Sequence, residues 1–60
     1  MPDLDEDKVL EMTQWLLEMG TVRLHAFNKK YPGTKKVQLE RHFSVTPVEG
    51  VKNQWEVALL

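Results

Sequence analysis

Residues 34–42 read Thr34-Lys35-Lys36-Val37-Gln38-Leu39-Glu40-Arg41-His42, and their conformation decides the fold. As a strand, this stretch places Val37 and Leu39 on one face, because side chains two residues apart point the same way. As a helix, it turns Leu39 and Phe43 inward, one turn apart. Both interpretations lead to an α+β protein, but they differ in the number of helices and in which residues face a ligand together.

The segment before this stretch predicts an N-terminal helix from about Leu4 to Met19. Asp3 and Glu6 have the spacing of a capping box, in which two side chains satisfy the first free backbone N–H groups. An acidic first turn also suits the positive end of the helix dipole. Gly20 is the expected stop, since glycine adopts a left-handed conformation without strain.

The apolar residues of this helix cover about 220° of its surface at 100° per residue. They are Val9, Leu10, Met12, Trp15, Leu16, Leu17 and Met19. One explanation is a helix packed on two sides within its own domain. The other is an interface to a second copy or to another protein, for which Leu10, Trp15 and Leu17 are the candidate residues.

Two architectures remain open after Gly20. Alternating apolar residues predict strands within 22–26, 37–45 and 55–59, with one helix packed on a three-stranded antiparallel sheet. Helical spacing instead predicts short helices from His25 to Tyr31 and from Thr34 to His42. The chain then ends in a C-terminal β-hairpin, formed by residues 43–48 and 55–59.

The second architecture resembles the compact winged-helix domains, including the LOTUS type found in RNA-associated proteins. The residues that carry the resemblance are the apolar positions of the first helix, Thr21-Val22-Arg23-Leu24 with Phe27, Leu39-x-x-x-Phe43-x-Val45, and Trp55-x-Val57-x-Leu59. The resemblance implies a strand after the first helix, two further helices and a terminal hairpin, over about residues 4–60. It also implies association with nucleic acid. The alternation of Val37 with Leu39 departs from this pattern and favours a strand.

Composition limits the classes of function. A chain of 60 residues with 42% hydrophobic content predicts one small domain over residues 1–60, either alone or as part of a longer protein. It has no Cys and two His, so we expect no disulfide and no metal site. No nucleophile lies in a catalytic motif and no glycine-rich phosphate loop is present, so we expect neither enzymatic activity nor a cofactor. Without an apolar run long enough to span a membrane, we expect an intracellular protein, in either the nucleus or the cytoplasm.

The net charge of −1 conceals a strong segregation of charge along the chain. Residues 1–20 hold six acids and one lysine, a net charge of −5, whereas residues 21–42 hold six basic residues and one acid, a net charge of +5. Binding depends on how charge is distributed over the surface as well as on its sum. The middle third is therefore where an anionic partner is expected.

Within this middle third, four lysines flank the predicted turn Tyr31-Pro32-Gly33-Thr34. We expect a nucleic-acid-binding module that contacts the phosphate backbone of DNA or RNA with little sequence specificity. The candidate contacts are Lys29, Lys30, Lys35, Lys36, Gln38, Arg41 and Arg23. The alternative is a protein-interaction or dimerisation module that uses the apolar face of the first helix.

Overall fold

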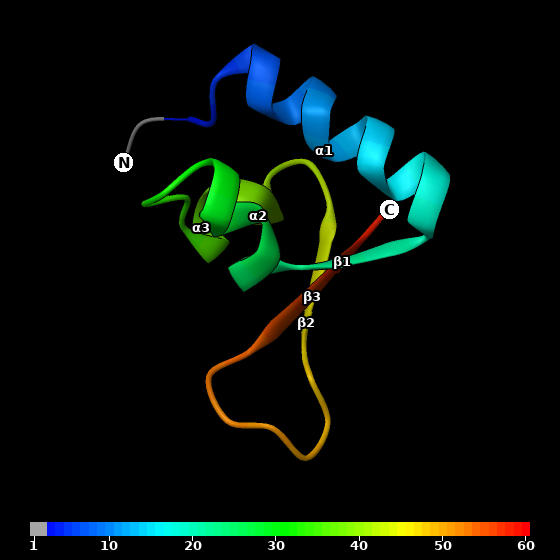
Figure 1. The fold of residues 1–60 in the computed structure, drawn as a ribbon, viewed down its shortest axis with the longest axis vertical. Helices are drawn as coiled ribbons and strands as arrows, with labels where there is room; N and C mark the ends of the chain where they lie inside the picture. The colour runs from blue at the N-terminus through cyan, green and yellow to red at the C-terminus, as the bar shows by residue number, and fades with distance from the viewer. Residues whose placement is uncertain (1–2) are drawn as a thin grey trace.

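The computed structural model describes residues 3–60 and confirms the α+β class. In chain order its elements are α1 (Glu6–Met19), β1 (Thr21–Arg23), α2 (Leu24–Lys30), α3 (Lys36–Glu40), β2 (Ser44–Pro47) and β3 (Trp55–Ala58). Figure 1 shows α1 across one end of the molecule, α2 and α3 beside it, and the loop between β2 and β3 at the opposite end.

Both ends of α1 are fixed by local bonds. Asp5 is the N-cap, and its side chain accepts a hydrogen bond from the Asp7 backbone N–H at 2.9 Å. The prediction that Asp3 caps the helix is wrong, because the Asp3 carboxylate instead accepts from the neighbouring Leu4 N–H at 2.8 Å. The predicted stop is confirmed: Gly20 has φ +82°, and its N–H donates to the Leu16 carbonyl at 2.8 Å.

The sheet is antiparallel, with strand order β1-β3-β2. Val57 of β3 lies opposite Val22 of β1 on one side and opposite Val45 of β2 on the other. The predicted C-terminal hairpin is confirmed as β2 and β3, and β1 adds the third strand. The last strand in the sequence is thus the central strand of the sheet.

Residues 34–42 contain a helix, so the prediction of a strand there is wrong. Leu39 and Phe43, one turn apart, are 0% and 4% exposed, and the Phe43 N–H donates to the Leu39 carbonyl at 2.8 Å. Val37, whose alternation with Leu39 favoured a strand, is 45% exposed. Burial of two residues at helical spacing therefore outweighs the local period-two pattern.

Residues 24–30 also form a helix rather than the continuation of a strand. Leu24 and Phe27, three residues apart, are both buried, and α2 ends where the Tyr31 N–H donates to the Phe27 carbonyl at 2.9 Å. The architecture with a single helix is therefore wrong, although a three-stranded antiparallel sheet is present.

The core lies between α1, the short helices and the sheet. Its buried members are Leu4, Met12, Leu16, Val22, Leu24, Phe27, Leu39, Phe43 and Val57. Phe27 is completely buried, and the rings of Trp15 and Tyr31 pack against it with centroids 5.3 and 5.0 Å away. This core fixes how α2 and α3 are presented to solvent.

Candidate nucleic-acid interface

The four lysines lie in and beside the segment that joins α2 to α3, which we call the lysine turn (residues 28–36). Its backbone is held from inside, because Thr34 is 7% exposed and its hydroxyl donates to the Tyr31 carbonyl at 2.9 Å. Gly33 has φ +85°, a conformation that favours glycine over other residues. The lysine side chains are therefore mounted on an ordered turn.

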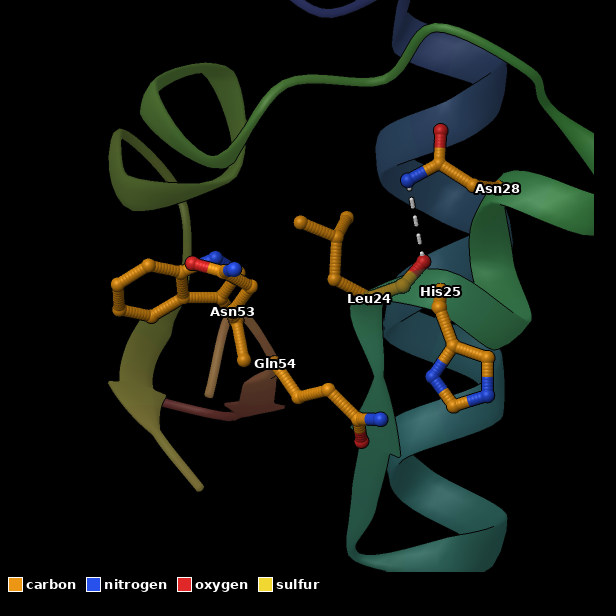
Figure 2. Close-up of a pocket in the computed structure, with 6 residues that line it drawn as sticks. Leu24, His25, Asn28, Asn53 and Gln54 are labelled. Atoms are coloured by element: carbon orange, nitrogen blue, oxygen red, sulfur yellow. Dashed lines mark hydrogen bonds between the residues drawn. The ribbon is translucent and has the colours of Figure 1, made fainter. Parts of the chain in front are cut away.

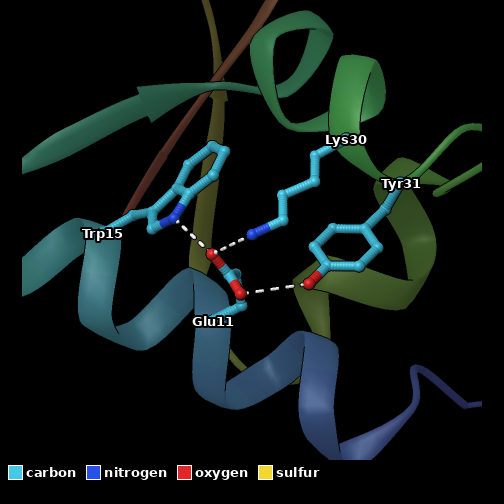
Figure 3. Close-up of polar contacts among 4 residues, drawn as sticks. All are labelled: Glu11, Trp15, Lys30 and Tyr31. Atoms are coloured by element: carbon cyan, nitrogen blue, oxygen red, sulfur yellow. Dashed lines mark hydrogen bonds and ion pairs between the residues drawn. The ribbon is translucent and has the colours of Figure 1, made fainter.

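Lys30 is held by α1. Its ammonium group lies 2.9 Å from Glu11 Oε2, which also accepts a hydrogen bond from Trp15 Nε1 at 2.7 Å. The other carboxylate oxygen of Glu11 accepts from the Tyr31 hydroxyl at 3.0 Å. Figure 3 shows the three donors converging on this one carboxylate from α1 and from the end of α2. Glu11 thus joins the first helix to the lysine turn.

The pKa values of this cluster follow its bonds. The hydrogen bond from Lys30, and then those from Trp15 and Tyr31, lower the pKa of the Glu11 carboxyl below its ordinary value. The same bond to Glu11 raises the pKa of Lys30. Burial raises the pKa of the Tyr31 hydroxyl, and the hydrogen bond to Glu11 acts in the same direction. Lys30 and Glu11 are therefore both charged at neutral pH and form an ion pair at 2.9 Å.

Lys36 is engaged by two other groups. Its ammonium lies 4.5 Å from the centroid of the Trp55 ring, which is within cation–π range. It also lies 3.5 Å from Glu40 Oε1, one turn further along α3. Lys36 therefore packs α3 against β3, and only part of its charge is available to an external anion.

The other candidate contacts divide into exposed and engaged residues. Lys29 in the last turn of α2, Lys35 at the N-cap of α3 and Arg41 at its C-cap are exposed. The Gln38 side chain accepts a hydrogen bond from the Lys35 backbone N–H at 2.9 Å, and Arg23 donates to Gln54. The structure thus presents Lys29, Lys35 and Arg41 to solvent and holds the other candidates in internal contacts.

The three candidate interface residues on α1 also differ in exposure. Leu10 and Leu17 are 57% and 71% exposed, whereas Trp15 is half-buried against Phe27. Beside Trp15 runs an open groove of about 450 Å³ between the end of α1, β1 and the start of α2. Its lining residues are Trp15, Met19, Thr21, Val22, Arg23, His25 and Ala26.

Sequence reasoning missed two features. One is the Glu11 cluster, whose four members are spread over 21 positions and meet only because α1 crosses α2. The other is a pocket of about 210 Å³ between α2 and the end of the β2–β3 loop, shown in Figure 2. Its lining residues are Leu24, His25, Asn28, Asn53, Gln54 and Trp55. Both are side-chain arrangements between distant segments, for which no local motif exists.

The two histidines lie apart from any constellation of ligands. His42 Nε2 lies 3.0 Å from Asp3 Oδ1, and this hydrogen bond lowers the pKa of the Asp3 carboxyl. Within residues 3–60, no group of three His, Cys, Asp or Glu side chains is arranged to hold a metal ion. No helix among these residues combines the length and apolar character needed to cross a bilayer.

The chain matches no protein-family model, no curated protein and no solved structure.

Proposed function

We propose that this protein is a non-enzymatic nucleic-acid-binding module that contacts the phosphate backbone through the exposed cations around the lysine turn and α3. The observation that carries the proposal is the exposure of Lys29, Lys35 and Arg41 on two consecutive helices and the turn between them. Exposed cations release counterions from nucleic acid when they bind it.

The order of the elements supports the same proposal. A helix, a strand, two helices and two strands follow one another in the order that a winged-helix domain requires. In such domains the second helix of the pair approaches a groove of the duplex. Because α3 here has only five residues, contact with the backbone is favoured over extensive reading of bases.

The salt dependence of binding tests the proposal. Three phosphate contacts predict that affinity falls about 20-fold for a single strand and about 40-fold for a duplex between roughly 50 and 200 mM salt. The double variant Lys29→Gln/Lys35→Gln leaves one contact and should reduce this loss to about threefold. Fluorescence anisotropy with labelled single- and double-stranded RNA and DNA measures both values.

The matched control is Lys30→Gln/Lys36→Gln, which removes the same charge from the same turn. Lys30 is held by Glu11, and Lys36 is held by Trp55 and Glu40. This variant should therefore lower the thermal stability, and it should change the salt dependence of binding less than Lys29→Gln/Lys35→Gln does. Equal salt dependence in the wild type and in Lys29→Gln/Lys35→Gln would refute the proposed contacts.

A second candidate function, protein interaction, is favoured by the exposure of Leu10 and Leu17 on α1. These two leucines lie two turns apart on one face of the helix, and exposed apolar patches of this kind mark surfaces that another protein covers. Sedimentation of the wild type and of Leu10→Ser/Leu17→Ser over a wide concentration range tests self-association directly. A monomer at every concentration, with unchanged shape in both proteins, excludes a homodimer through this face.

A further inference from the structure

The pocket between α2 and the β2–β3 loop is large enough for one part of a ligand and too small for a whole drug-sized molecule. Its volume of about 210 Å³ is below the roughly 300–1,000 Å³ of sites that enclose a drug-sized ligand. The β2–β3 loop that forms one wall is closed at its base by a hydrogen bond from the Val48 N–H to the Gln54 carbonyl at 3.0 Å. The pocket therefore suits one planar ring system belonging to a longer molecule.

The polar groups of one wall are fixed by Arg23. A guanidinium group only donates hydrogen bonds, so the Gln54 side chain presents its Oε1 to Arg23 Nη1. The Gln54 Nε2 group then points away from Arg23, and no partner for it is found within residues 3–60. This wall therefore offers a hydrogen-bond donor whose identity is set by the structure.

The opposite wall offers an acceptor by the same reasoning. Asn28 Nδ2 donates to the Leu24 carbonyl at 3.2 Å, a bond that only the nitrogen of this amide can make. Figure 2 shows the Oδ1 atom of Asn28 on the side away from that carbonyl, and in the described part of the chain it accepts no hydrogen bond. Asn28 and Gln54 thus line different walls of one pocket, and each keeps one amide atom without a hydrogen bond in residues 3–60.

The remaining walls are apolar or aromatic, and a cation lies beside them. Leu24 is buried beneath the pocket, and Trp55 contributes an aromatic ring. The Lys36 ammonium lies 4.5 Å from the centroid of that ring and is only partly neutralised by Glu40 at 3.5 Å. None of the six residues that line the pocket is acidic, so an anionic group beside it meets no carboxylate of the lining.

We propose that this pocket binds a single unpaired nucleobase. Every nucleobase carries donors and acceptors on its edge and an apolar face, which matches the Gln54 donor, the Asn28 acceptor and the walls formed by Leu24 and Trp55. The attached phosphate then lies within reach of Lys36. This inference rests on the proposed nucleic-acid function and adds to it that the bound strand is at least locally single.

The test is Gln54→Glu, which keeps an oxygen facing Arg23 but replaces the free donor by a carboxylate oxygen. The ligands are a single-stranded oligonucleotide of about eight residues and the abasic oligomer of the same length, which has the same phosphates. The wild type should bind the intact oligomer about tenfold more tightly than the abasic one. In Gln54→Glu this preference should disappear. The matched control is Gln14→Glu on the exposed surface of α1, which adds the same charge and should keep the preference.

Two negative results are distinguishable. Equal, salt-dependent binding of both oligomers by the wild type would overturn the base pocket and leave phosphate binding by the lysine turn intact. If neither oligomer and no duplex binds at low salt, the proposed function itself is refuted.

An independent readout is the NMR spectrum of the pocket. A mononucleotide at millimolar concentration should shift the side-chain NH₂ resonances of Asn28 and Gln54, whereas ribose 5-phosphate should not. Equal shifts from both compounds would also overturn the base pocket.

Discussion

Leu16 and Leu17 are neighbours in α1 with opposite environments, and they allow a matched test of which face of the helix is internal. Leu16 is 2% exposed and Leu17 is 71% exposed. Replacement by Ala removes the same atoms at both positions. Leu16→Ala should cost about 2–5 kcal/mol, because it removes buried methyl groups and leaves a cavity. Leu17→Ala should change stability by no more than about 0.5 kcal/mol.

The total stability of the domain makes this difference easy to measure. At about 0.05–0.15 kcal/mol per residue, a 60-residue domain has a free energy of unfolding of about 3–9 kcal/mol. Leu16→Ala therefore removes from about a quarter to all of it. In a domain of this size the Tm should fall by about 8 °C or more, whereas Leu17→Ala should move it by a few degrees at most.

Urea unfolding followed by far-UV circular dichroism gives the free energies of both variants. Tryptophan fluorescence offers a second probe, since both Trp15 and Trp55 pack against the core. Equal losses for Leu16→Ala and Leu17→Ala would refute the assignment of the inner face. A loss for Leu17→Ala that grows with protein concentration would show instead that a second copy covers Leu17.

Further predictions concern the Glu11 cluster and the end of α1. The hydrogen bonds to Glu11 lower its folded-state pKa below the ordinary 4.5, so this carboxylate stabilises the fold above about pH 4.5 and loses that effect as the pH falls through the lowered value. Glu11→Gln should flatten the acid side of a plot of Tm against pH, with Glu18→Gln as the exposed control, and an unchanged acid side would contradict this account. Gly20→Ala should cost about 1–2 kcal/mol in urea unfolding, because φ is +82° there, even though the added methyl group would meet no atom within 4 Å beyond its chain neighbours and the backbone of α1 itself. If Gly20→Ala left the free energy of unfolding unchanged, α1 would be able to end in another conformation.

The elements that could be predicted from the sequence are those in which apolar periodicity and the cap or turn residues indicate the same structure. They are the first helix, its stop at Gly20 and the C-terminal hairpin. Residues 34–42 were ambiguous because Val37 and Leu39 imitate a strand, and only the burial of Leu39 with Phe43 selects a helix. The N-cap was displaced by two residues because several acids in the opening segment are equally suitable caps.

The candidate site was predictable in composition but not in pairing. Counting charges located the lysine turn, yet the sequence does not indicate which lysines remain available to a ligand. Lys30 meets Glu11 across 19 positions, and Lys36 meets Trp55 of β3 across a similar separation. These contacts depend on the crossing of α1 with α2 and on the docking of α3 beside β3, which are properties of the assembled core.

The central place of β3 in the sheet has a consequence during protein synthesis. Within the sheet, β1 and β2 each pair with β3 and not with each other. Their backbone groups therefore have no strand to pair with until residues 55–58 have left the ribosome. At about 5–20 residues per second, the ribosome needs roughly 2–6 seconds to proceed from the end of β1 to the start of β3. By the end of that interval the nascent chain carries two strand segments without their partner strand, together with an apolar helix, and a chaperone that recognises such segments can bind them.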